Sequence, residues 1–129
     1  MGYKSALEAA GAEVLAYKMF GNWQGEWWAK VNLDGVVGWV EGSFGSCSVC
    51  DPFQSKMDGF DYRWDSVARE YVDAPEEERQ AALVEFGQSY LTHLQTPEEA
   101  KAWADQQLLS EDTWRDEDKE AAQFILENM

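Results

Sequence analysis

The two cysteines are the residues whose spacing most directly suggests chemistry. Cys47 and Cys50 are separated by two residues, and Asp51 follows them at once. Two thiols at this spacing can chelate a zinc ion or form a reversible disulfide. Structural zinc has four ligands, so Asp51 and the thiols of a second copy in a symmetric homodimer would be needed to complete the site. A third interpretation is purely structural, with two small cysteines in a loop that leads from a sheet to a helix.

No other group of residues indicates an enzyme. The single histidine, His93, lies in a predicted helix and far from the cysteines along the chain. Pairs of carboxylates are so numerous that none stands out as a general acid and base. The sequence contains no nucleophile elbow, no phosphate-binding P-loop and no zinc-protease helix motif. We therefore expect a protein without catalytic residues and without a cofactor, apart from the zinc alternative at Cys47 and Cys50.

Acidic residues form the second group that suggests a function, because they are distributed very unevenly. Residues 1–50 hold five acidic and three basic residues, whereas residues 51–129 hold 20 acidic and seven basic ones. The net charge of −15 therefore lies mainly in the C-terminal part of the chain. Such a field repels nucleic acids and anionic membranes, and it attracts basic protein surfaces. We expect a basic protein as the partner, with no direct contact to nucleic acid or membrane.

The acidic residues cluster at the predicted starts of three helices. A carboxylate in the first turn interacts favourably with the helix dipole, which accounts for some of them without a partner. The excess needs another explanation, since residues 73–129 hold 15 acidic and only four basic residues. Carboxylates three or four positions apart on a helix lie roughly 5–6 Å from one another and can imitate a phosphate backbone, although the charge can also serve solubility alone. The candidate partner-binding residues are Glu76, Glu77, Glu78, Glu98, Glu99, Asp112, Asp116, Glu117 and Asp118.

A three-stranded antiparallel meander is predicted for residues 12–44. β-branched and aromatic residues are frequent there and alternate with other types, which is typical of strands. Asp34 and Gly35 form the dipeptide most typical of a two-residue hairpin turn. The three predicted strands span residues 12–20, 26–33 and 36–41.

Alternation along the second strand separates two neighbouring tryptophans. Trp27 falls on a uniformly apolar face, which we expect to pack on helices. Trp28 falls on the opposite face, together with Glu26, Lys30 and Asn32. We therefore expect Trp28 to belong to an exposed aromatic patch, which makes it a further candidate for contact with a partner or with a second copy of the chain.

The segments after the meander are predicted with different clarity. Residues 45–60 form a loop rich in Gly, Ser and Cys and then a short helix, whose N-cap is Asp51 before Pro52. Residues 61–72 are compatible with a strand or with a helix. Residues 73–129 form an acidic helical part, in which Thr96, Pro97 and Glu99 make up a strong helix start.

The fold class that results is α+β, in a single domain that spans residues 1–129. A three- to four-stranded antiparallel meander packs against C-terminal helices. A short helix precedes the sheet, with a capping box between Ser5 and Glu8 and an end near Gly11. No apolar run approaches the length of about 20 residues that a membrane span needs, and the start of the chain lacks the apolar core of a signal peptide. We expect a cytoplasmic protein.

The stretch from Gly21 to Gln54 resembles a scattered family of small uncharacterised proteins from phages and prophages. The most specific element is the pattern Gly-Ser-Phe-Gly-Ser-Cys-Ser-x-Cys-Asp, and the resemblance covers about two-thirds of the chain. It brings no activity and no catalytic residue. It implies a phage setting, in which small acidic proteins often block host nucleases or other nucleic-acid-binding defence proteins. The stretches that carry it are residues 25–29, 38–51, Phe53 and 85–91.

The leading hypothesis is therefore a non-enzymatic, phage-type acidic protein that acts in the host cytoplasm. It would bind and inhibit a basic, nucleic-acid-binding host protein by imitating the charge of a nucleic acid. The competing hypothesis is a small zinc- or thiol-dependent module centred on Cys47 and Cys50. A third is a structural or assembly protein that associates through Trp28 and its neighbours.

Overall fold

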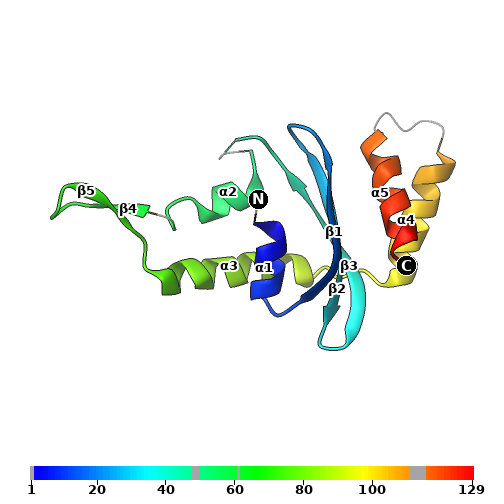
Figure 1. Cartoon of the computed structure of the whole chain (residues 1–129), viewed down its shortest axis with the longest axis horizontal. Helices are drawn as coiled ribbons and strands as arrows, with labels where there is room; N and C mark the ends of the chain where they lie inside the picture. The colour runs from blue at the N-terminus through cyan, green and yellow to red at the C-terminus, as the bar shows by residue number, and fades with distance from the viewer. Residues whose placement is uncertain (1, 48–49, 61, 111–115) are drawn as a thin grey trace.

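A three-stranded antiparallel sheet forms the middle of the molecule (Figure 1). The computed structural model describes residues 2–47, 50–60, 62–110 and 116–129. The predicted meander is confirmed, and its strands lie in the order in which they follow along the chain. Asp34 and Gly35 both have positive φ, 53° and 89°, as a tight turn between antiparallel strands requires. The strands are β1 (Glu13–Gly21), β2 (Gly25–Leu33) and β3 (Val36–Phe44).

Helices cover both faces of this sheet (Figure 1). On one side lie α1 (Tyr3–Ala9), α2 (Pro52–Met57) and α3 (Glu76–Leu91), and on the other lie α4 (Pro97–Leu109) and α5 (Asp116–Glu127). The predicted α+β class is confirmed, with helices C-terminal to the sheet packed on it. The sheet separates two hydrophobic cores, one built around Trp27 and the other around Trp28 and Trp39.

The prediction that Trp28 is exposed is wrong. Its side chain is 0% exposed, because α4 and α5 cover the face of the sheet from which it projects. The helices approach closely because they present alanines to the large indole rings, and the ring of Trp103 lies 4.7 Å from that of Trp28. Trp28 is therefore a core residue and is not available to a partner or to a second copy. The alanines are Ala100, Ala104, Ala121 and Ala122.

Two of the predicted helix starts are confirmed and one is wrong. Thr96 and Glu99 form the expected capping box at α4. Asp51 caps α2 by accepting a hydrogen bond from the N–H of Gln54. The first helix, however, begins at Tyr3, so Ser5 lies inside it and makes no cap. The earlier start carries the Tyr3 ring into the core, where burial outweighs the capping preference of Ser5.

The region from 61 to 72, for which strand and helix were both open, contains a second small sheet. β4 (Tyr62–Asp65) and β5 (Glu70–Asp73) form an antiparallel hairpin that is separate from the meander. This β4–β5 hairpin projects away from the rest of the molecule at the start of α3 (Figure 1). Arg63 links it to the first turn of α3 through an ion pair with Glu78.

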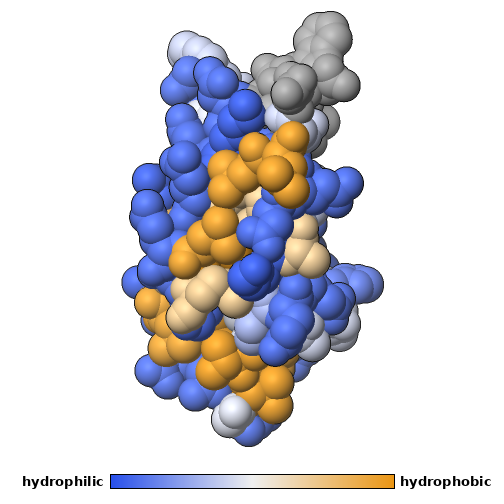
Figure 2. Space-filling model, turned by 90° about the vertical axis from the view of Figure 1, so that its right-hand side faces the viewer, coloured by the Kyte–Doolittle hydropathy of each residue, from blue (hydrophilic) through white to orange (hydrophobic). Residues whose placement is uncertain are grey.

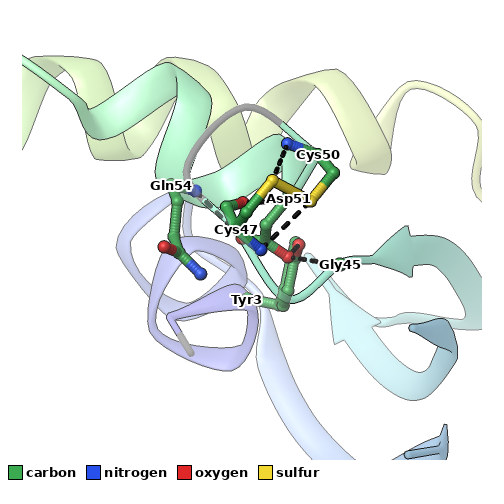
Figure 3. Close-up of a disulfide and its surroundings, with 6 residues drawn as sticks. All are labelled: Tyr3, Gly45, Cys47, Cys50, Asp51 and Gln54. Carbon is green, nitrogen blue, oxygen red and sulfur yellow. Dashed lines mark hydrogen bonds between the residues drawn. A yellow bond between two sulfur atoms is a disulfide. The ribbon is translucent and has the colours of Figure 1, made fainter. Parts of the chain in front are cut away.

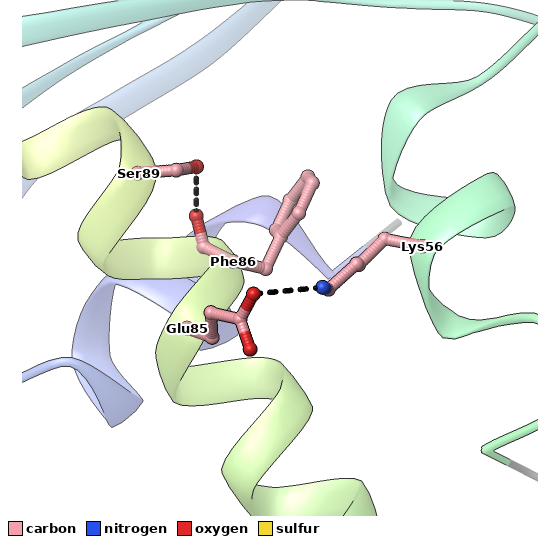
Figure 4. A network of polar contacts seen from close by, with 4 residues as sticks. All are labelled: Lys56, Glu85, Phe86 and Ser89. Atoms are coloured by element: carbon pink, nitrogen blue, oxygen red, sulfur yellow. Dashed lines mark hydrogen bonds and ion pairs between the residues drawn. The ribbon is translucent and has the colours of Figure 1, made fainter.

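One ion pair joins α2 to α3 (Figure 4). The Nζ of Lys56 lies 3.0 Å from a carboxylate oxygen of Glu85, and the hydroxyl of Ser89 donates to the carbonyl of Phe86 within α3. The Phe86 side chain is buried in the core beneath. Within the described ranges of the chain, no helix has the length and apolar character that crossing a bilayer requires.

Candidate functional site

Cys47 and Cys50 form a disulfide at the end of the loop that follows β3 (Figure 3). The N–H of each cysteine points to the sulfur of the other, at 3.0 Å and 3.1 Å. Of the two chemistries that the spacing allows, the structure contains the disulfide. In this form neither sulfur is a thiolate that could bind zinc, and no cluster of three or more metal-binding side chains occurs among the described residues.

Asp51 has a structural role directly after the disulfide, rather than the ligand role considered from the sequence. Its buried carboxylate accepts hydrogen bonds from the Tyr3 hydroxyl, the Gly45 N–H at 3.0 Å and the Gln54 N–H at 2.9 Å (Figure 3). Burial, and next the bond to Asp51, raise the pKa of the Tyr3 hydroxyl well above its usual value, so Tyr3 stays protonated and donates. Asp51 thereby joins α1, the end of β3 and α2.

An open pocket of about 400 Å³ lies beside the disulfide. The β1–β2 turn, the end of β3, the cysteine loop and the start of α5 each contribute to its wall. A neighbouring hollow of about 440 Å³ shares Glu117 with it. We call the two together the acidic pocket, because carboxylates dominate their charged residues. Their lining residues are Met19, Gly21, Asn22, Gln24, Gly25, Glu26, Ser43, Phe44, Cys50, Asp116, Glu117, Asp118 and Glu120.

The carboxylates of the acidic pocket come from two elements that are far apart in the sequence, β2 with Glu26 and the start of α5. Asp116, Glu117 and Asp118 form the first turn of α5. Near them, on β3, partial burial and then the negative charge of Asp118 raise the pKa of the Glu41 carboxyl above its usual value. The charge of Asp118 on α5 therefore influences a carboxyl group on β3.

The structure distributes the sequence-predicted acidic residues over three separate places. The starts of α3, α4 and α5 lie at different ends of the molecule (Figure 1), so the three clusters do not form one surface. Glu76, Glu77 and Glu78 lie beside the β4–β5 hairpin, where Glu78 pairs with Arg63. Glu98 and Glu99 begin α4, where the Glu99 side chain is used in the capping box. Asp112 lies outside the described residues.

Three acidic residues of this region were not predicted as site residues. Glu26 and Glu120 line the acidic pocket, and Glu41 lies near enough to be influenced by Asp118. Part of the signal was present, since alternation already placed Glu26 on the same side of the sheet as Trp28. The strand register, which the sequence did not give, places Glu41 on this side too, because Trp28 pairs with Glu41 and cross-strand partners share a face.

The outer surface of α4 and α5 is not uniformly acidic. Seen from that side, hydrophobic residues form an oblique band through a hydrophilic surface (Figure 2). Leu108 and Leu109 at the end of α4, and Met129 at the chain end, are among the exposed large apolar residues. The acidic residues of α5 are concentrated instead in its first turn, which lines the acidic pocket.

No protein-family model, curated protein or solved structure matches the chain. The choice between candidate functions therefore depends on the geometry and the charge of the molecule itself.

Proposed function

We propose that this protein is a non-enzymatic inhibitor that binds a basic, nucleic-acid-binding protein through the acidic pocket. The observation that carries the proposal is the meeting of the first turn of α5 with Glu26 of β2 beside one open hollow. A basic side chain that enters this hollow would interact with several carboxylates at once. This pocket is smaller than the acidic surface expected from the sequence, because it includes only one of the three predicted acidic clusters, the one at the start of α5.

Lys30, a basic residue on the second strand, points away from this pocket. Lys30 lies on the strand that contributes Glu26, but its Nζ donates to the carbonyl of Asn128 at 2.7 Å. That contact lies just beyond the C-terminal end of α5, whereas the acidic pocket lies at its N-terminal end. A helix of this length separates the two ends by roughly 18 Å. Lys30 therefore does not neutralise Glu117 and Asp118.

Inhibition follows if the partner uses the same basic residues to hold phosphates. Carboxylates that occupy those residues would compete with nucleic acid for them. The resemblance of residues 21–54 to small phage proteins favours a host defence protein as the target and the host cytoplasm as the place of action.

A pull-down with matched charge-reversal variants tests the proposal. The tagged protein is used to capture partners from a nuclease-treated bacterial lysate, with elution by a salt gradient. We expect one basic protein, released as salt rises. The double variant Glu117→Lys, Asp118→Lys should weaken its binding about tenfold or more, because two attractions become repulsions. The control Glu76→Lys, Glu77→Lys makes the same change of charge at α3 and should retain the partner.

The captured protein then decides whether the function is inhibition. Its affinity for nucleic acid should fall as the wild-type protein is added, and should stay unchanged when the α5 variant is added. A partner that binds nucleic acid equally well in the presence of this protein contradicts inhibition. Equal losses from the α3 and α5 variants contradict the assignment to the acidic pocket.

The disulfide favours a second candidate function, a thiol-dependent module. Cys50 is exposed and lines the acidic pocket, so an incoming thiolate could attack it, open the Cys47–Cys50 bond and form a mixed disulfide. Titration of free thiols in glutathione buffers of graded potential tests this function. A change from disulfide to free thiols within the range of redox potentials found in the cytoplasm supports this function. A bond that stays oxidised throughout that range of potentials contradicts it. Zinc binding by the reduced form is tested by reducing the protein in the presence of zinc ions, removing unbound metal and measuring the zinc content.

A further inference from the structure

The β4–β5 hairpin carries the most exposed group of aromatic side chains in the described chain. Tyr62 is 64% exposed, Trp64 56% and Tyr71 73%. The rings of Trp64 and Tyr71 pack edge to face, with their centres 5.3 Å apart. Contiguous exposed aromatic surface of this kind is typical of contact sites and is unusual elsewhere on a soluble protein. The acidic pocket does not include any of these residues.

Strand register shows that these rings share one face of the hairpin. Trp64 pairs with Tyr71 and Tyr62 pairs with Asp73, and residues directly opposite in an antiparallel pair point to the same side. Arg63 alternates to the other face, where it is bound to Glu78 of α3. We call the side formed by Tyr62, Trp64, Tyr71 and Asp73 the aromatic face.

From this arrangement we infer that the aromatic face of the β4–β5 hairpin binds arginine- and lysine-rich segments of a protein partner. An aromatic ring attracts a cation over its face, and the carboxylate of Asp73 adds a second attraction at the same place. Neither cross-strand pair on this face contains a lysine or an arginine. These two pairs themselves therefore offer a phosphate no counter-charge, although the rings could stack on bases. The charge distribution selects a basic protein segment over a nucleic acid.

The inference deepens the proposed function, on which it rests for the basic character of the partner. The hairpin projects from the opposite side of the molecule to α4 and α5 (Figure 1). A partner that contacts both the acidic pocket and the aromatic face would span the molecule. Two separate sites of this kind increase affinity and restrict the orientation of the partner.

A binding experiment with short peptides tests the aromatic face separately from the pull-down. The probes are a fluorescent peptide with arginines spaced by serines, and a serine–glycine peptide of the same length. Anisotropy is measured at high salt, where attraction by the distant charge of the molecule is screened. We expect the double variant Trp64→Ala, Tyr71→Ala to weaken binding of the arginine peptide about tenfold, the order of effect of two cation–π contacts. Asp73→Asn should weaken it about two- to threefold.

Two further variants distinguish loss of contact from loss of hairpin structure. Trp64→Phe with Tyr71→Phe keeps the rings, and should retain most of the affinity. Val67→Ser removes apolar surface at the tip of the same hairpin, and should leave the affinity unchanged. In the NMR spectrum, the arginine peptide should shift the indole N–H signal of Trp64 in the wild-type protein.

Each alternative occupant gives a different result. Equal binding of the serine–glycine peptide, or an unchanged affinity in the alanine variant, overturns the inference. Self-association that the alanine variant abolishes would assign the face to a second copy and also overturn it. The Glu117→Lys, Asp118→Lys variant separates the two proposals, because it should leave peptide binding at high salt intact. If the pull-down contradicts the role of the acidic pocket, the measured binding of the arginine peptide to the aromatic face is therefore unaffected.

Discussion

The body of the molecule and the β4–β5 hairpin use the same residue types in opposite ways. In the body, Trp28 is fully enclosed between the sheet and two helices, with rings of Trp39 and Trp103 against it. In the hairpin, Trp64 has one ring partner among the described residues, Tyr71, and remains more than half exposed. Both tryptophans lie on antiparallel strands. The difference teaches that the layers packed on a strand, rather than the strand itself, decide whether an aromatic residue stabilises the fold or is available for contact.

Replacing the two tryptophans by alanine should give the largest difference between the regions. Trp28→Ala removes a large ring from a closed core, and should lower the free energy of unfolding by about 3–5 kcal/mol. Trp64→Ala removes a ring from the surface, and should change it by no more than about 0.5 kcal/mol. Urea denaturation of both variants measures the contrast. Similar losses would show that the hairpin folds cooperatively with the core.

The second comparison concerns two aspartates that accept backbone hydrogen bonds. Asp51→Ala should destabilise the protein by about 1–3 kcal/mol, because it leaves the buried Tyr3 hydroxyl and the Gly45 N–H without their acceptor. Asp65 accepts from the N–H groups of Val67 and Ala68 in the hairpin turn, which is exposed. Asp65→Ala should therefore cost less than about 1 kcal/mol, since water can replace the acceptor. Thermal unfolding compares the two, and a greater loss at Asp65 would contradict the contrast.

Reduction of the disulfide should have a smaller effect, confined to the body. The Cys47–Cys50 bond closes a very short loop, so its loss should lower the stability by no more than about 2 kcal/mol. Unfolding is measured in the presence of a thiol reductant, with the Cys47→Ser, Cys50→Ser variant as a control that is insensitive to it. NMR signals of the hairpin residues should stay in place, because the bond lies in the loop after β3. Movement of the Trp64 indole signal on reduction would show that the two regions are coupled.

The smallest effect concerns Glu41, whose pKa is raised in the folded protein. A raised carboxyl pKa means that the folded state binds the proton more tightly, so this contribution to stability is lost as the pH rises through the folded pKa. Glu41→Gln should therefore increase the melting temperature near neutral pH, with a gain that shrinks as the pH falls into the acid range. Glu70→Gln removes the same charge from the hairpin and controls for net charge. An equal, pH-dependent gain in both variants would assign the effect to the overall charge.

Much of the fold followed from local signals in the sequence. The Asp34-Gly35 turn, the N-cap at Asp51 and the capping box at Thr96 each depend on a few adjacent residues, and each is present in the structure. Alternation also separated Trp27 from Trp28 correctly. It could not show that both faces of the sheet are covered, because that depends on where α4 and α5 pack.

The candidate site was less predictable for the same reason. The sequence indicated the three acidic clusters and the cysteine pair, but their relative positions depend on contacts between distant segments. Glu26 was not expected to meet Glu117, since 90 residues separate them along the chain. The sequence of 61–72 left strand and helix open, so the shared face of Trp64 and Tyr71 became visible only through their register.

The sequence by itself determined the meander, the starts of α2 and α4, the strong negative charge and the cysteine spacing that permits a disulfide. These features depend on backbone preferences and side-chain chemistry within a few residues. Only the tertiary structure decided that Trp28 is core, that Trp64 is surface, and that the start of α5 meets the sheet beside Cys50. Burial and electrostatic field arise from groups brought together across the fold, and a local pattern does not contain them.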